Sequence, residues 1–441
     1  MRMMVVVTAL LPRTTGFSAA AVRTTARKHA RRCVTARAER VGKPKAMYRP
    51  TSPSYPLTEM DEPRALSGLP DRSRPFTVLG IETSCDDTAA AIVRSDGTIV
   101  AEAIMPQHEV HAKFGGVVPS LAKEAHQEAI EAVVAQVLQR AGLESARELD
   151  AISATVGPGL EICLRVGARK AAQLASDFEL PFVGCHHLEG HCLVARLAEP
   201  CRFPFLSLCV SGGHSMIVKC EGVGRYQVLG GTLDDALGEA YDKAARMLGL
   251  DMKGGGGPEL ERVAREGNPT SVPLPVPMKK RKDCDFSYAG LKTALKLQIE
   301  KKRHDAGLVD EEEPLPDQDV ADLAASFQHV AITHLEDRLA YAFDRVRADD
   351  AFQSDQGRPQ LALVGGVASN AEVRRRVSLL CDRAGWDLVV PPPKLCTDNG
   401  VMIAWAAIEK LHLGFSDAID DEVYPRWPFR PPASVAAPAL P

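Results

Sequence analysis

The pattern of apolar and polar residues divides the chain into two similar blocks, each beginning with closely spaced apolar runs. The first block opens with FTVLGIETSCDDTAAAIVRSDGTIVAEAI, residues 76–104, in which two apolar runs flank Asp96-Gly97. An Asp-Gly pair between apolar runs predicts a β-hairpin. A short polar tract, from Glu82 to Thr88, interrupts the first run.

Helical and strand patterns alternate behind each hairpin pattern. In the first block we expect a helix at 122–141, a strand at 150–159, a helix at 162–178 and a strand at 181–185. The second block opens with FPFLSLCVSGGHSMIVKCEGVGRYQVLGG, residues 203–231. It continues with a helix at 239–250, helices to about 346, a strand-turn-helix at 360–370, a strand at 388–394 and a closing helix at 399–411.

This repetition predicts an α/β fold in which two RNase H-like lobes face a nucleotide cleft. It is the two-lobed arrangement of actin, the sugar kinases and the Hsp70 ATPases. We expect the first lobe at 76–200, completed by the closing helix at about 400–413. The second lobe is expected at 201–399, with an insertion at about 270–320, and residues 414–441 form a tail.

The first fifty residues differ in composition from the rest, because they hold twelve Lys or Arg and one acid, Glu39. A basic, hydroxyl-rich and acid-poor start predicts an organelle transit peptide, followed by a Pro-rich linker, together residues 1–75. A short apolar run at residues 3–11 makes a secretory signal the alternative. A mitochondrion and a plastid are alternatives that this composition does not separate.

The charge of the remaining chain bears on possible partners. The presequence carries +12 and −1, so the formal net charge of −4 leaves about −15 for residues 51–441. A nucleic-acid partner therefore requires a local basic patch. The densest basic run is Lys279–Lys282, for which a solvated loop is the alternative.

Cysteine usage argues against a disulfide-stabilised protein, and hydropathy argues against a membrane-spanning one. The eleven cysteines contain no C-x-x-C pair and lie in apolar segments, which predicts reduced buried thiols. No apolar run reaches about eighteen residues, so no membrane span is expected.

Three glycine-rich turns suggest a shared anion-binding cleft. They are VSGGH at 210–214, KGGGGPELE at 253–261 and LVGGVASN at 363–370. Glycine lets backbone N–H groups approach phosphate oxygens, and Pro258 and Glu259 fit the first two positions of a helix. An ordinary hairpin turn, a flexible linker and a common α/β turn are the respective alternatives.

The stretch CHHLEGHCLVARL places His187 and His191 four residues apart, where a helix can begin. Such residues share one helix face about 6 Å apart and can hold one metal ion. Asp398, at the start of the closing helix, offers a third ligand, and two histidines with one carboxylate suit Fe or Zn. A protease base would follow the first histidine directly, whereas Glu189 lies about 200° around the helix from His187.

With these pieces placed, residues 77–413 resemble the tRNA threonylcarbamoyltransferase family, formerly called O-sialoglycoprotein endopeptidases. Ten blocks occur in the family's order: GIETSCDDTAAAIV, HAKFGGVVPSLAKEAH, GPGLEICLRVGARKA, HHLEGH, VSGGH, LGEAYDKAARMLGL, GGGGPELE, DFSYAGLKTAL, GGVASN and TDNG. The basic extension resembles the mitochondrial branch, which implies a homodimer. The resemblance implies transfer of a threonylcarbamoyl group from threonylcarbamoyl-AMP, supplied by a separate synthase, to N6 of adenosine 37. The acceptors are tRNAs reading codons that begin with A.

The resemblance also implies roles for individual residues. One divalent metal, Fe or Zn, would be held by His187, His191 and Asp398. The donor's adenylate would be held by Cys209, Val210, Ser211, Gly212, Gly213, Asp242, Gly257 and Asn370. The family commonly has Glu where this chain has Ser120, and its glycine loop is shorter, so Gly254, Gly255 and Gly256 stay alternatives to Gly257.

The donor is an activated mixed anhydride, which calls for positioning and charge stabilisation more than for a nucleophile. His111 and Glu82 are the candidates for the proton acceptor of the attacking amine. The alternative functions are a metalloprotease of glycoproteins and a sugar-kinase-like phosphotransferase.

Overall fold

The computed structural model describes residues 64–429 except 112–113, 115, 311–312 and 353–356, and all of these belong to one unit, residues 50–441. Most of the predicted transit peptide and linker lies outside the described residues.

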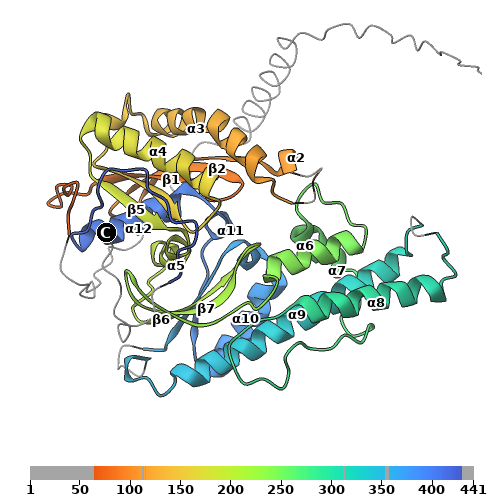
Figure 1. Cartoon of the computed structure of the whole chain (residues 1–441). Coiled ribbons are helices and arrows are strands. Elements are labelled where there is room, and N and C mark those ends of the chain that lie inside the picture. Colours follow the sequence, from red (N-terminus) through yellow and green to blue (C-terminus); the bar gives the residue numbers. More distant parts are fainter. Residues whose placement is uncertain (1–63, 112–113, 115, 311–312, 353–356, 430–441) are drawn as a thin grey trace, which may run out of the picture. The chain divides into compact units, whose positions relative to one another are not determined.

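The first block forms a mixed five-stranded sheet in the order β3-β2-β1-β4-β5 (Figure 1). Its strands are β1 (Thr77–Glu82), β2 (Asp87–Arg94), β3 (Ile99–Pro106), β4 (Ala151–Gly157) and β5 (Phe182–His186). The predicted Asp-Gly hairpin is confirmed as the β2–β3 turn, where Gly97 has a φ of +85°. The polar tract makes a second turn between β1 and β2, so the block begins with three antiparallel strands where the pattern suggested two.

Helices cover both faces of this sheet. Alternating residues of β1 divide between two cores, with Leu79 and Ile81 on one face and Val78 on the other. The first face packs against α3 (Pro119–Ala141) and α4 (Glu161–Phe178), and the second against α5 (His187–Ala198) and α12 (Gly400–His412). Figure 1 shows α3 and α4 above the sheet and α12 below it. Short helices at α2 (His108–His111) and η2 (Ala146–Glu148) lie in the connections.

The second block repeats this topology in the order β10-β9-β6-β7-β8, again with three antiparallel and two parallel strands. The prediction of two α/β lobes of like topology is therefore confirmed. The strands are β6 (Phe205–Val210), β7 (Ser215–Gly222), β8 (Arg225–Gly231), β9 (Gln360–Val364) and β10 (Asp387–Val389). The helices are α6 (Leu237–Met247), α7 (Gly256–Ala264), α8 (Ala289–Asp305), α9 (Asp317–Val346), α10 (Ala371–Ala384) and α11 (Pro393–Cys396), with η3 (Asp350–Phe352) and η4 (Gly366–Ser369).

Two of the departures from the predicted boundaries have a clear physical reason. Helix α7 begins at Gly256, two residues before Pro258, because Gly255 caps it with a φ of +93° and Asp242 accepts the N–H of Gly257. Strand β10 ends at Val389 and not at 394, because the prolines from 391 to 393 cannot donate to a sheet.

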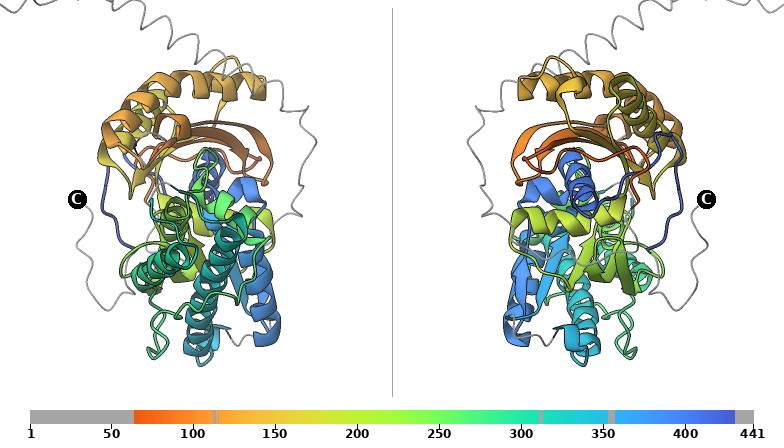
Figure 2. Two further views of the ribbon diagram at one scale, coloured as in Figure 1. Left: turned by 90° about the vertical axis from the view of Figure 1, so that its right-hand side faces the viewer. Right: turned by 90° about the vertical axis from the view of Figure 1, so that its left-hand side faces the viewer.

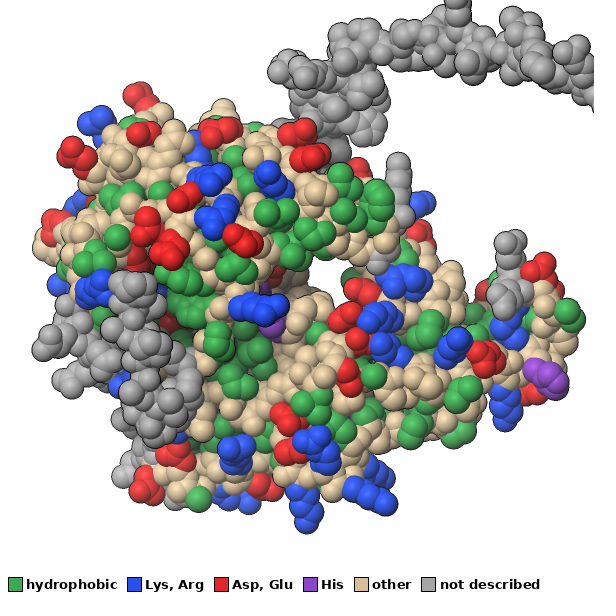
Figure 3. Space-filling model, viewed as in Figure 1, with side chains coloured by type: hydrophobic (Ala, Val, Ile, Leu, Met, Phe, Trp, Pro, Cys, Tyr) green, Lys and Arg blue, Asp and Glu red, His purple; other side chains and the backbone are tan. Residues whose placement is uncertain are grey.

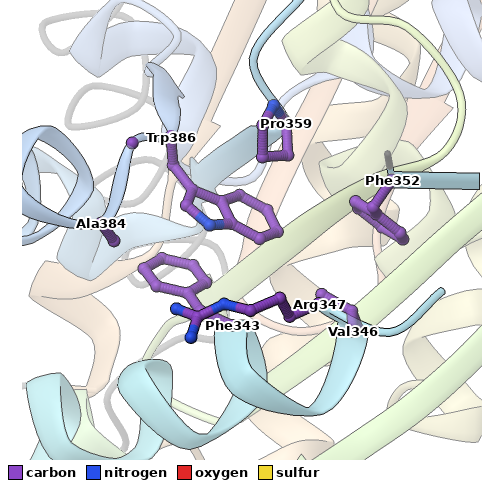
Figure 4. Close-up of a pocket in the computed structure, with 8 residues that line it drawn as sticks. Phe343, Val346, Arg347, Phe352, Pro359, Ala384 and Trp386 are labelled. Carbon is purple, nitrogen blue, oxygen red and sulfur yellow. The ribbon is translucent and has the colours of Figure 1, made fainter. Parts of the chain in front are cut away.

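A cavity of about 350 Å³ lies at the C-terminal end of α9 (Figure 4). Phe343 and Trp386 stack inside it with their ring centroids 4.3 Å apart. The other lining residues are Val346, Arg347, Phe352, Pro359, Ala384 and Gly385. None of them belongs to the histidine pair or the glycine-rich turns, so this cavity is separate from the predicted site.

Candidate metal centre

Helix α5 is buried along its whole length because it lies between the two sheets. Leu193 and Val194 pack with α12 and the first sheet, whereas Cys192 and Ala195 pack against strands of the second sheet. Gly190 lets α12 approach closely, since a Cβ there would meet Ile403 at 3.1 Å. The helix that carries the histidine pair is thus fixed between the two halves of the fold.

The structure brings His187, His191 and Asp398 together in one group whose ligand atoms lie within 4.8 Å of one another. Asp398 Oδ1 lies 3.0 Å from His191 Nε2 and 3.7 Å from His187 Nε2. The rings of the two histidines are edge-to-face, with centroids 4.8 Å apart. The group joins the first turn of α5 to Asp398, which lies two residues before α12.

This geometry fits a metal ion. Two ligand atoms that bind one ion at about 2.1 Å, at roughly 90–110°, lie about 3.0–3.4 Å apart. The observed separations from Asp398 Oδ1, 3.0 and 3.7 Å, are close to that range. Nε2 of each histidine therefore faces the Asp398 carboxylate at a separation that one ion could bridge, while Nδ1 of His191 is buried without a hydrogen-bond partner among the described residues.

On its Nδ1 side, His187 contacts the last residue of β1 and the loop that follows this strand. Its Nδ1 lies 3.2 Å from both Glu82 Oε2 and Ser84 Oγ. The buried Glu82 carboxylate also accepts hydrogen bonds from the Ser84 N–H, at 2.6 Å, and from the Thr155 hydroxyl. A carboxylate on the second nitrogen is the usual partner of a metal-binding histidine, and it leaves Nε2 of His187 for the ion. Ser84 and Thr155 were missed from the sequence because single hydroxyl residues carry no pattern.

The charges of the group shift the pKa values of its members. Burial alone would lower the pKa of His187, but the carboxylates of Asp398 and Glu82 outweigh it and raise that pKa to about 9. Burial would raise the pKa of Asp398, yet the positive charge of His187 and the hydrogen bond from His191 hold it well below its usual range. The metal-free group is therefore a charged cluster in which a proton occupies His187.

Metal affinity should rise with pH in consequence. Binding must displace the proton of His187, so we expect the apparent affinity for Zn²⁺ to increase by about tenfold per unit between pH 7 and 9. The stability of the metal-free chain should move in the opposite direction. A raised pKa stabilises the fold fully below the unfolded value near 6.5, and this contribution is lost as the pH rises through about 9. Competition with a chromophoric chelator and thermal unfolding, each measured from pH 6 to 9, check the two trends.

Glu189 points away from the group, as the helix geometry predicted. Its carboxylate accepts hydrogen bonds from the Gly224 N–H and the Tyr226 hydroxyl, both at 2.9 Å, and pairs with Lys410 at 3.1 Å. It therefore anchors α5 to the β7–β8 turn and to α12.

The structure places the VSGGH turn beside the metal group. The ring centroids of His214 and His187 lie 6.3 Å apart, and burial followed by the positive charge of His187 lowers the pKa of His214 to about 4. The backbone of Gly212 and Gly213 is open, since a Cβ at either would meet nothing within 4 Å. The side chains of Cys209 and Val210 are buried in the sheet and offer only backbone groups to a ligand.

The remaining predicted donor-binding residues continue from this turn. Gly238, at the start of α6, donates its N–H to Ser211 O at 3.1 Å. One helical turn on, Asp242 Oδ1 accepts the N–H of Gly257 at 3.0 Å, and burial raises the pKa of its carboxyl. Asn370 caps α10 by accepting the N–H of Val373, and its amide donates to Gln328 Oε1 at 3.2 Å. Both polar ends of Asn370 thus have partners within the fold.

Figure 3 shows a hollow between the first sheet's helices and α6, with Lys, Arg, Asp and Glu side chains gathered along the α6–α7 rim. His111 is buried near α3, where its Nε2 bonds to Gln107 Oε1 at 3.1 Å and its Nδ1 accepts the Val118 N–H at 3.3 Å. No hydrogen bond among the described residues joins His111 to the metal group. Ser120 is exposed in the first turn of α3.

Comparison with known proteins finds a family model, sequence relatives and a solved structure to which the chain is similar. Residues 98–405 match the family model described as tRNA N6-adenosine threonylcarbamoyltransferase. A probable mitochondrial tRNA N6-adenosine threonylcarbamoyltransferase of Arabidopsis thaliana is 46% identical over 395 residues, which cover 86% of this chain and 81% of that protein. The Rhodospirillum rubrum enzyme of that name is 44% identical over 370 residues, covering 83% and 98%. The solved activator of 2-hydroxyisocaproyl-CoA dehydratase from Clostridium difficile aligns at 12% identity with a TM-score of 0.44, covering 76% and 96%.

The fold and the site define an α/β protein with two like sheets and a histidine-histidine-carboxylate group beside glycine-rich turns. The chain belongs to the tRNA N6-adenosine threonylcarbamoyltransferase family. None of the helices in the described part of the chain is long and apolar enough to cross a membrane.

Proposed function

We propose that this chain transfers the threonylcarbamoyl group of threonylcarbamoyl-AMP to N6 of adenosine 37 in tRNAs that read codons beginning with A. The observation that carries the proposal is the group of His187, His191 and Asp398 beside the VSGGH turn, in a chain that belongs to this family. We further propose that the group holds one divalent metal ion, Fe or Zn. When bound, such an ion supplies Lewis-acid stabilisation of developing negative charge.

We assign the adenylate part of the donor to the residues that lie between the metal group and α7. Gly212 and Gly213 present open backbone N–H groups for the phosphate, next to the N-terminus of α6, which favours anions. Asp242 can accept hydrogen bonds from ribose hydroxyl groups with its free lone pairs. Gly257 and Asn370 border the base, and Cys209, Val210 and Ser211 contribute backbone groups. The absence of a Cβ at Gly256 keeps α7 against Asp242.

The two candidates for the proton acceptor lie in different surroundings. Glu82 accepts three hydrogen bonds behind His187, which favours a role in orienting that ligand. His111 is the last residue of α2 and is the candidate that we keep for accepting the proton of the attacking amine. A single alanine replacement of His111 that lowers kcat and alters its pH profile, with KM for the donor unchanged, supports this assignment.

The transfer itself is tested with the purified full chain, threonylcarbamoyl-AMP and an unmodified tRNA. We expect N6-threonylcarbamoyladenosine in the digested tRNA, detected by mass spectrometry, and none when guanosine replaces adenosine 37. Hydrolysis of a glycoprotein without a tRNA product would favour the metalloprotease. Phosphorylation of a small hydroxylated substrate would favour the kinase. The partners of Glu189 already argue against its service as a protease base.

The tRNA is assigned a contact with the basic run at Lys279–Lys282, which lies in an exposed turn before α8. Both Lys280 and Arg281 are exposed, but Arg281 pairs with Asp283 and Asp285, whereas Lys280 forms no ion pair among the described residues. We expect Lys280→Glu to weaken tRNA binding and to reduce the slope of log Kd against log salt by about one. Filter binding at several salt concentrations measures this. Arg383→Glu, an exposed charge reversal on α10, is the matched control and should bind as wild type.

The proposal also covers the oligomeric state of the chain and the source of its donor. The chain is expected to act as a homodimer, which sedimentation at assay concentrations tests, and to receive its donor from a separate synthase.

A mitochondrial location is supported by the similarity to the probable mitochondrial enzyme of Arabidopsis and by the basic first fifty residues. A fluorescent protein fused behind residues 1–75 should enter mitochondria, and entry into plastids would replace this assignment. We also propose that the two lobes span residues 76–200 and 201–399.

A further inference from the structure

A segment near the C-terminus, Ser416–Phe429, runs along the edge of the first sheet toward the second (Figure 2, dark blue). We call it the C-terminal strap. Asp417 donates its N–H to Phe182 O at 2.8 Å, and its Oδ2 accepts the N–H of Gly184 at 2.8 Å. Tyr424 donates its N–H to Val156 O at 2.7 Å. The strap is thus fastened to β4 and to the edge strand β5, and it lies beyond the residues that match the family model.

The far end of the strap contacts the residue that precedes the metal-binding helix. Trp427 O lies 2.8 Å from Nε2 of His186, and the Phe429 ring stacks on the His186 ring at 4.6 Å and 14°. Phe429 also lies 4.7 Å from the ring of Tyr226 in β8. The strap therefore ends between the start of α5 and the second sheet.

His186 connects this contact to the helix by capping it. Its Nδ1 accepts the N–H groups of Leu188 and Glu189, at 3.1 and 3.4 Å. A nitrogen that accepts cannot carry the ring proton, so the proton is on Nε2, which donates to Trp427 O. One buried imidazole thus joins the first turn of α5 to the strap. His187 follows it directly, and His191 lies one turn further.

We propose that the C-terminal strap is a positioning element of the metal centre, which acts through His186 to fix the orientation of the first turn of α5. Metal ligands need outer contacts that hold their rings in place, and such contacts strengthen metal binding. Glu189 holds the same turn from its other side, through Gly224, Tyr226 and Lys410. The inference rests on the metal site of the proposed function and adds an element to it that lies outside the ligand set.

The test separates the cap from the strap contact. In His186→Asn the side chain still caps the helix, because Asn is a preferred N-cap, but it cannot reach Trp427 O. We expect the metal-stripped full chain with this change to bind Zn²⁺ about tenfold to a hundredfold more weakly, measured against a chromophoric chelator. The Tm of the metal-free variant should stay close to that of wild type. Phe429→Ala should weaken Zn²⁺ binding in the same direction, and His186→Ala should lose both affinity and Tm.

The control lies on the strap itself. Asp421→Ala removes an exposed ion pair with Arg169, away from α5, and should change neither Zn²⁺ affinity nor Tm. Wild-type Zn²⁺ affinity in His186→Asn, or an equal loss in Asp421→Ala, would overturn the strap's role. A wild-type chain that binds no Zn²⁺ would overturn both this inference and the metal site. A chain that binds Zn²⁺ but modifies no tRNA would refute only the proposed transfer.

Discussion

Replacement of His191 by alanine is expected to abolish threonylcarbamoyl transfer and to leave the purified chain without bound metal. His191 Nε2 lies 3.0 Å from Asp398 Oδ1, and the ring is almost fully buried, so no other described side chain takes its place. Loss of an ion that stabilises charge by several kcal/mol corresponds to a rate about a thousandfold lower or more. Elemental analysis of the purified variant and the tRNA modification assay measure the two effects together.

Two further variants make this result specific. Asp398→Asn keeps the size of the ligand but removes its charge, and we expect it to lose metal and activity in parallel with His191→Ala. His304→Ala removes a histidine with a side chain 90% exposed at the end of α8, and it should keep both. Full metal content in a chain that carries both His191→Ala and Asp398→Asn would refute the ligand set. Retained metal with lost transfer would instead make His191 a group that contacts the substrate.

The ligand set was accessible from sequence because each member leaves a pattern. Two histidines four residues apart define one helix face, and Asp398 stands where a strand pattern gives way to a helix. The same helix geometry correctly predicted that Glu189 points away from the histidine pair. The repeated order of strand and helix patterns predicted the two like sheets, because the hydrophobic period of each element can be seen within a short stretch of sequence.

The supporting contacts could not be predicted because they join residues far apart in the chain. Glu82 reaches His187 across 105 positions, and the contact depends on how β1 and β5 are placed in one sheet. The sequence does not predict His186 as a helix cap, because Ser, Thr, Asp and Asn are the usual capping residues. The sequence predicts only a tail where the strap lies, because the contacts of Trp427 and Phe429 are tertiary and follow no period.

Substitution of Gly400 by alanine is expected to weaken metal binding and lower stability together, although Gly400 is not a proposed ligand. A Cβ on Gly400 would lie against backbone atoms of Ala90 and Ala91 in β2, and one on Gly80 would lie 2.9 Å from the Cα of Ala404. These two glycines let α12 touch the first sheet backbone to backbone. Neither contact can be relieved by a rotamer change, so α12 must shift.

The shift is transmitted to the metal group because Asp398 stands two residues before Gly400. Overpacking of this kind costs about 1–3 kcal/mol, and displacement of a ligand by less than 1 Å is enough to impair a metal site. We expect Gly400→Ala to lower the Tm by several degrees and Zn²⁺ affinity by at least about tenfold. Gly290→Ala is the matched control, because a Cβ there meets nothing within 4 Å and alanine favours helix α8. A Gly400→Ala chain with a lowered Tm but wild-type Zn²⁺ affinity would show that α12 moves independently of Asp398.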